Sequence, residues 1–218
     1  MNSDFIKQVL AVEDEVWWKA AFAKDPMSGK ADEFRRGEII RDAVETGKSA
    51  ALEVLEQFPR RSLYQIALEW NIRFVPESSD EFQGLHLFAL FSAPNTIIIY
   101  EKNIGDIEAY IEENKLQALL KGLRLQEIVI AHELFHCYEY NHPSLFTNTI
   151  RLDYTVMGPI RLKSKLTAPS EIAAMSFARE LTGYKYNPYI CDILFLLPHS
   201  EEKALRVFNG ISENRQQN

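Results

Sequence analysis

Hydrophobic side chains in the first part of the chain recur with the period of an α-helix. Over residues 3–23 they form one broad apolar stripe, which predicts a helix. The run from Asp25 to Gly29, with its proline and glycine, ends that helix. Residues 31–57 return to helical spacing, and Gly47 marks a point where we expect this second helix to be interrupted. We therefore treat residues 1–61 as an N-terminal helical extension.

The spacing of apolar positions becomes strand-like after a short predicted helix over residues 62–70. Three segments are typical of β-strands, namely residues 71–76, 85–91 and 96–100. The third is the clearest, because it is β-branched and apolar on both faces. Together these segments predict a small three-stranded sheet.

Helical spacing dominates the remainder of the chain. The predicted helices cover residues 104–111, 116–141, 171–181 and 188–197. Residues 143–166 read as irregular, with a short extended segment in which Arg161, Lys163 and Lys165 alternate with apolar residues. The predicted fold class is α+β, mainly helical, with one small sheet.

We expect a single domain over residues 1–218. Its central part, residues 62–182, follows the N-terminal extension, and residues 183–218 form C-terminal helices and a tail. The last five residues, 214–218, are polar and predicted to be disordered.

Composition narrows the class of protein. Hydrophobic residues make up 46% and charged residues 25%, which is ordinary for a soluble globular protein. The net charge of -7 argues against general nucleic-acid binding. The first residues lack the pattern of a signal peptide, and the longest apolar runs, such as 193–197, are too short to span a membrane. With only Cys137 and Cys191, no disulfide framework is indicated, so we expect a cytoplasmic protein.

The segment His132-Glu133-Leu134-Phe135-His136 carries the most specific chemistry in the chain. On a helix, His132 and His136 lie on one face about one turn apart, so both imidazoles can reach one metal ion. Glu133 then lies to the side, where it can reach a metal-bound water. Apolar residues flank the motif on both sides, as the helix beside an active site requires. The competing interpretation, a core helix with hydrogen-bonded histidines, buries three polar groups for no purpose.

Catalytic zinc usually has three protein ligands, and two residues compete for the third place. Glu171 falls in the first turn of the predicted downstream helix, which could pack against the motif helix. His142 instead fits the spacing of the metzincin pattern, but Glu139 occupies the position of its turn-forming glycine. A structural zinc site that uses His142 as a fourth ligand is a further alternative.

The order of these motifs resembles the ImmA/IrrE-type metallopeptidases, a gluzincin-like family. In that family a downstream E-x-x-A-N-x-F-A segment supplies the third ligand, and residues 171–178 match it except that Met175 stands where Asn is common. The resemblance covers residues 62–182 and implies a zincin-like fold, with the sheet packed on the H-E-x-x-H helix. It implies His132, His136 and Glu171 as Zn²⁺ ligands and Glu133 as the general base.

We therefore expect a zinc-dependent peptidase that acts on a peptide or protein substrate, without a nucleic-acid or membrane partner. A residue that stabilises the oxyanion is also required, and His142, Tyr138 and Tyr154 are candidates. An alternative from another class is a catalytically silent metal-binding sensor or protein-interaction module on the same fold.

Overall fold

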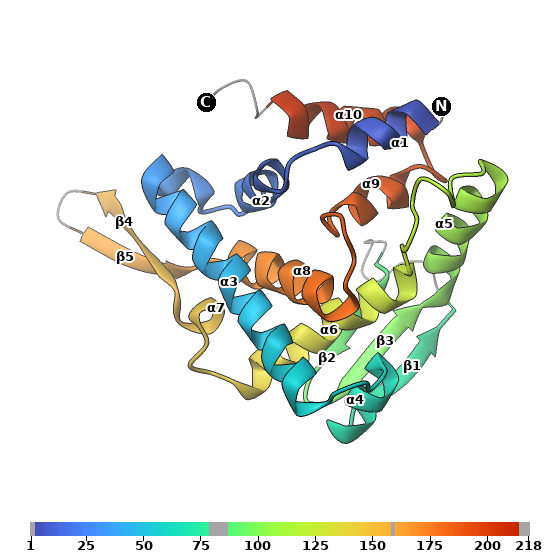
Figure 1. The fold of residues 1–218 in the computed structure, drawn as a ribbon. Helices are drawn as coiled ribbons and strands as arrows, with labels where there is room; N and C mark the ends of the chain where they lie inside the picture. Colours follow the sequence, from blue (N-terminus) through green and yellow to red (C-terminus); the bar gives the residue numbers. More distant parts are fainter. Residues whose placement is uncertain (1–2, 79–86, 158–159, 214–218) are drawn as a thin grey trace.

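The protein has an α+β fold that is mainly helical, with a small mixed sheet at one end (Figure 1). The structure, a computed structural model, describes residues 3–78, 87–157 and 160–213. Within these ranges no helix combines the length and the apolar composition needed to cross a bilayer. The predicted disorder of the tail lies outside the described residues.

The N-terminal region forms three α-helices and one turn of 3-10 helix: α1 (Ser3–Leu10), α2 (Asp14–Ala23), η1 (Ser28–Lys30) and α3 (Glu33–Gln57). The prediction of a single helix over residues 3–23 is wrong, because α1 and α2 bury their apolar sides against different partners. Phe5 of α1 contacts Phe208 edge-to-face, whereas Trp18 of α2 packs in the same manner on Tyr189. Helical periodicity reports which residues are buried but not where the chain changes direction.

Three strands form the sheet near the candidate site, as the pattern predicted. They follow α4 (Leu63–Glu69) and are β1 (Arg73–Glu77), β2 (Ala89–Ser92) and β3 (Thr96–Tyr100). The order is β1-β3-β2, with β1 parallel and β2 antiparallel to the central β3. The central strand buries Ile97 and Ile99, and β2 is an edge strand that lies beside the motif helix (Figure 1). The first two residues of the predicted strand 85–91 lie outside the described residues.

Two helices follow the sheet, α5 (Glu101–Glu113) and α6 (Leu125–Asn141), and α6 carries the motif. The predicted helix 116–141 was too long, because residues 115–124 form turns in which Lys115 and Gly122 have positive φ. The apolar Leu116 and Leu120 in these turns are buried, so they imitate a helical stripe without belonging to one.

Residues 143–166 are more regular than predicted. They form α7 (Phe146–Thr149) and an antiparallel hairpin of β4 (Arg151–Met157) and β5 (Ile160–Lys165), which extends away from the rest of the protein (Figure 1). The hairpin is a separate two-stranded sheet with exposed positions such as Leu162. Alternation of charged and apolar residues over 161–165 was its only sequence signal.

The C-terminal region contains α8 (Ala168–Thr182), α9 (Ile190–Leu196) and α10 (Glu201–Glu213). The helix α8 ends one residue beyond the predicted helix 171–181, and the following Gly183 has the left-handed conformation with φ 66°. The helix α10 lies within the predicted C-terminal region 183–218, but its own residues were not predicted as a helix. It lies beside α1, so the two ends of the described chain are neighbours (Figure 1). The helices of residues 3–57 share one hydrophobic cluster with α6 and α8, and the division at residue 61 stays a prediction.

The helix α3 is continuous through Gly47, contrary to the predicted interruption. A Cβ atom added at Gly47 would lie 2.0 Å from the carbonyl oxygen of Ala173 on α8. Glycine therefore occupies this position because the backbones of α3 and α8 approach closely, and not because the helix breaks.

Gly47→Ala should destabilise the protein, because the added methyl group meets a backbone carbonyl that cannot move aside. We expect a loss of about 1–3 kcal/mol or more in the free energy of unfolding, measured by urea denaturation. The matched control is Gly37→Ala on the exposed side of α3, where nothing lies within 4 Å of an added Cβ. That variant should gain about 0.5–1 kcal/mol. Equal stability of the two variants would contradict the close contact of α3 with α8.

Candidate metal centre

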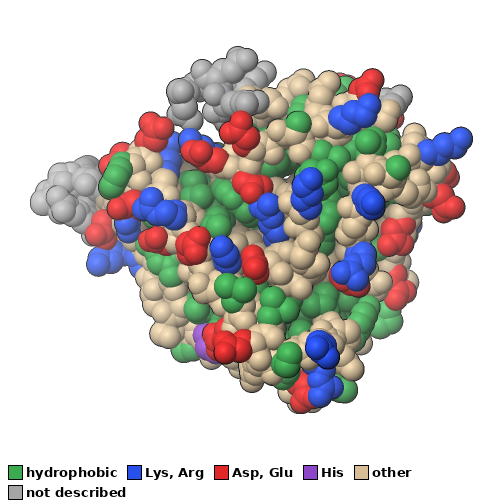
Figure 2. Space-filling view, viewed as in Figure 1, with side chains coloured by type: hydrophobic (Ala, Val, Ile, Leu, Met, Phe, Trp, Pro, Cys, Tyr) green, Lys and Arg blue, Asp and Glu red, His purple; other side chains and the backbone are tan. Residues whose placement is uncertain are grey.

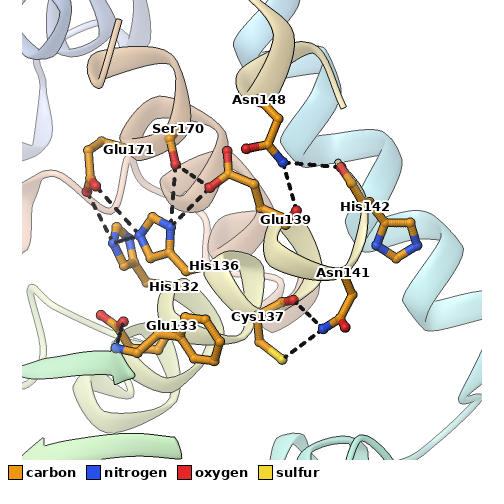
Figure 3. A network of polar contacts seen from close by, with 11 residues as sticks. His132, Glu133, His136, Cys137, Glu139, Asn141, His142, Asn148, Ser170 and Glu171 are labelled. Carbon is orange, nitrogen blue, oxygen red and sulfur yellow. Dashed lines mark hydrogen bonds and ion pairs between the residues drawn. The ribbon is translucent and has the colours of Figure 1, made fainter. Parts of the chain in front are cut away.

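The two histidines of the motif point to the same side of α6 (Figure 3). Their Nε2 atoms are 3.1 Å apart, and the side chains are 13% and 18% exposed for His132 and His136. The helix is buried on its other sides by residues that include Ile130, Leu134 and Phe135. Burial of the rest of α6 therefore fixes the direction in which both imidazoles face.

Glu171 on α8 faces both imidazoles, as the downstream-helix hypothesis requires. One carboxylate oxygen lies 3.3 Å from Nε2 of His132, and the other lies 3.6 Å from Nε2 of His136. One ligand atom from each residue lies within 4.8 Å of the others, so the group could hold a metal ion. Partial burial opposes the charge on Glu171, but the adjacent His132 and His136, with Lys24, lower its pKa to about 2.

His142 does not join this group. It ends α6, its ring stacks on Tyr138 with centroids 3.9 Å apart, and its Nδ1 lies 2.7 Å from the Tyr138 carbonyl oxygen. Figure 3 shows its imidazole directed away from His132 and His136. The helix continues through Glu139 because no glycine turns the chain there, so the structure supports neither alternative that made His142 a ligand.

Glu133 lies on the β2 side of the histidines. Its side chain is buried, and one carboxylate oxygen accepts a hydrogen bond of 2.6 Å from the backbone N–H of Phe91 on β2 (Figure 3). This bond ties the motif helix to the edge strand. It also holds one oxygen of the carboxylate in place.

Ser170 and Glu139 contact the Nδ1 side of the His136 ring. Neither contact was predicted from the sequence. Nδ1 of His136 lies 3.4 Å from the hydroxyl of Ser170 and 3.7 Å from the Glu139 carboxylate, and Ser170 donates a hydrogen bond of 2.7 Å to Glu139. Such partners orient a metal-binding imidazole and increase its basicity. Two features of the sequence could have predicted these contacts: the i, i+3 spacing of His136 and Glu139, and the position of Ser170 directly before Glu171.

Three nearby carboxylates raise the pKa of His136. Burial alone would lower the pKa of His136, but Glu139, Glu171 and Glu133 outweigh it and raise the pKa to about 9. The pKa of Glu139 falls below its ordinary value despite burial, because His136 and Ser170 stabilise its ionised form. The metal-free centre therefore holds a proton on His136 at neutral pH.

Asp25 connects the N-terminal helices to the site. It is 5% exposed, and its carboxylate accepts hydrogen bonds from the backbone N–H groups of Thr167 and Ala168, 2.7 and 3.0 Å long. It thus caps the first turn of α8, which carries Glu171. In the sequence this aspartate indicated only the end of a helix.

A cavity of about 1010 Å³ adjoins the centre. Its lining includes His132, His136, Glu133 and Glu171, together with Met175 one turn further along α8. The lining is mainly apolar away from these groups, with contributions from β2, α6, α9 and α10.

The three candidates for the oxyanion-stabilising residue do not line this cavity. Tyr138 donates a hydrogen bond of 2.6 Å from its hydroxyl to Glu53 on α3, and His142 lies beside it. Tyr154 belongs to the β4–β5 hairpin. Tyr140 and Tyr189 are the tyrosines that line the cavity among the described residues.

Charged side chains of both signs are interspersed on the face of the molecule shown in Figure 2.

No family model matches the chain, and no curated protein or solved structure is detectably similar to it. The resemblance to the ImmA/IrrE-type metallopeptidases thus stays a prediction. The candidate centre is supported by its own geometry, in which His132, His136 and Glu171 form a group able to hold a metal ion.

Metal binding should release a proton at neutral pH, because His136 has a pKa of about 9 and a coordinating imidazole must be neutral. The apparent affinity for Zn²⁺ should therefore rise about tenfold per pH unit between about pH 6 and 8, and level off where His136 is already neutral. Calorimetry at about pH 7 in two buffers of different ionisation enthalpy counts the released protons.

Glu139→Gln removes a carboxylate that keeps His136 protonated, so it should reduce the number of protons released. Asp153→Asn provides the control, since Asp153 lies on β4 and pairs with Lys163 at 3.8 Å. An affinity that does not change with pH would show that His136 does not bind the metal.

Proposed function

We propose that the protein is a zinc-dependent peptidase with a zincin-like arrangement of its sheet and motif helix. The observation that supports this most is the convergence of His132, His136 and Glu171, with Glu133 held beside them by β2. Two imidazoles and one carboxylate are the donors of a common class of catalytic zinc site. Within the described residues, no fourth His, Cys, Asp or Glu joins the group, which leaves room for a water or substrate.

A Zn²⁺ ion held by these three residues would lower the pKa of a water molecule and polarise the scissile carbonyl. Glu133 would take the proton of the attacking water and transfer it to the leaving amine. Its bond to the Phe91 N–H limits the motion of the carboxylate, so the free oxygen keeps one direction through both proton transfers. Ser170 and Glu139 would hold the ring of His136 in its orientation.

The edge strand β2 would align the substrate. The Tyr100 N–H donates to the Phe88 carbonyl, and Leu90 pairs with Ile98, so the polar groups of Ala89 and Phe91 face away from β3. Phe91 uses its N–H for Glu133, which among the described residues leaves its carbonyl and both polar groups of Ala89 for an extended peptide.

The apolar part of the cavity would select the substrate side chain. An antiparallel peptide on β2 would place its C-terminal residues toward Phe88, at the start of the strand. There the cavity is lined by Phe88, Phe195, Leu196 and Val207, and the first two rings are 4.9 Å apart. We expect a large apolar side chain on the C-terminal side of the cleaved bond.

Glu133→Gln should abolish peptide hydrolysis while Zn²⁺ remains bound. The amide oxygen can still accept from Phe91, but it cannot take a proton, so kcat should fall by about 10²–10⁴. Cleavage of a fluorogenic peptide library and metal analysis provide the two measurements. The control is Glu127→Gln on the same helix, where Glu127 pairs with Arg124 at 3.1 Å and does not line the cavity.

Glu171→Ala in the same assay should lose bound zinc together with activity. Cleavage that is unchanged in Glu133→Gln would refute the proposed role of Glu133. A wild-type protein that binds zinc but cleaves no peptide would instead support the silent metal-binding module.

Leu196→Trp should narrow the apolar end of the cavity, because Leu196 lies on α9 among its lining residues. For peptides with phenylalanine on the C-terminal side of the bond, kcat/KM should fall about 10–200-fold, and for alanine it should change little. An equal loss for both substrates would place the specificity elsewhere.

A further inference from the structure

The proposed reaction needs a hydrogen-bond donor where negative charge develops on the carbonyl oxygen. Two tyrosines line the cavity within the described part of the chain, Tyr140 on α6 and Tyr189 at the start of α9. Phenols are effective donors in such a role, so the question is which of the two lies on the required side.

Tyr140 lies on the side of the general base. Its ring packs on Phe91 with centroids 6.1 Å apart, and the N–H of Phe91 holds the Glu133 carboxylate. In the tetrahedral intermediate the attacking oxygen and the carbonyl oxygen diverge from the same carbon. Because Glu133 must face the attacking oxygen, the donor to the other oxygen belongs on the opposite side of the cavity.

Tyr189 lines the cavity from the start of α9, and its ring packs on Trp18 of α2 rather than on β2, so we assign it to the side opposite Glu133. The negative charges of Asp192 and Glu171 both act on its phenol. Its ring is fixed by an edge-to-face contact with Trp18 at 5.6 Å and by Nζ of Lys24 at 5.8 Å from its centre. A ring held from two directions provides a donor in a fixed position, as oxyanion stabilisation requires.

The hydroxyl of Tyr189 has no hydrogen-bond partner among the described residues, although the side chain is only 6% exposed. The nearby carboxylates are otherwise engaged, because Asp192 pairs with Lys24 at 2.9 Å and Glu171 faces the histidines. An unpaired buried hydroxyl is costly, and because this one belongs to a residue that lines the cavity, a bound substrate could supply its partner. Burial raises the pKa of this phenol, so it retains its proton at neutral pH.

We propose that Tyr189 is a catalytic residue that donates a hydrogen bond to the substrate carbonyl oxygen as it becomes an oxyanion. The inference rests on the proposed peptidase function and names a residue for it. The apolar enclosure strengthens such a bond, because the local dielectric constant is low.

The test compares Tyr189→Phe with Tyr184→Phe in the full-length, zinc-loaded protein. Tyr184 is a matched control, since its hydroxyl is also buried without a partner but does not line the cavity. Tyr189→Phe should lower kcat about 10²–10³-fold, with KM and zinc content nearly unchanged. Tyr184→Phe should retain wild-type kinetics.

A second measurement does not depend on turnover. A peptide phosphonamidate, which carries tetrahedral anionic oxygens, should bind Tyr189→Phe about 10²-fold more weakly than it binds the wild type. A product peptide of the same sequence, which lacks these tetrahedral oxygens, should bind both proteins equally. If Tyr189→Phe matches Tyr184→Phe in both measurements, or if Tyr140→Phe alone loses kcat and phosphonamidate affinity, the assignment of Tyr189 is wrong.

The two proposals fail in different ways. Failure of the peptidase function would appear as wild-type activity in Glu133→Gln or as no cleavage by the wild type. In either case the phosphonamidate still reports on Tyr189, because its binding requires the donor and not the turnover. Weak binding of the phosphonamidate to the wild type itself would overturn the role of Tyr189.

Discussion

The packing of α8 against α3 on one side and α6 on the other is the constraint on which the site depends. Gly47 allows the backbones of α3 and α8 to approach closely, and Asp25 caps the first turn of α8. These contacts set the position of that turn, from which Glu171 faces the histidines of α6. The N-terminal helices therefore contribute to the centre although none of its ligands belongs to them.

The electrostatics of the centre are consistent with this packing. Two imidazole nitrogens 3.1 Å apart would repel each other if both were charged, and the surrounding carboxylates of Glu133, Glu139 and Glu171 compensate for positive charge. In the metal-free protein the compensated charge is a proton on His136. A divalent cation could replace that proton without new carboxylates, so the group could hold a metal ion in its present geometry.

Much of the site could be predicted because its signals are local. His132, Glu133 and His136 lie within five residues of one helix, and Glu171 falls in the first turn of another, where the match to a family segment singled it out. The three strands near the site carried equally local signals, and all three are present. The β4–β5 hairpin and α10 were not predicted, since the order of charged and apolar residues in these segments does not distinguish a helix, a strand or a loop.

The outer parts of the site could not be predicted, because each depends on a contact between distant segments. Ser170 and Glu139 meet across two helices, and Phe91 reaches Glu133 from a strand 42 residues earlier. Tyr189 carries no motif and is distinguished only by its place in the cavity and its unpartnered hydroxyl.

By itself, the sequence determined the identity and helical spacing of the candidate metal ligands and the presence of a small sheet, because periodicity and motif spacing act along one element. Only the tertiary structure decided that Glu171, rather than His142, faces the two imidazoles. It also decided which tyrosines border the cavity. The physical reason is that these choices follow from the direction in which packed helices present their side chains, and that direction depends on partners far away in the chain.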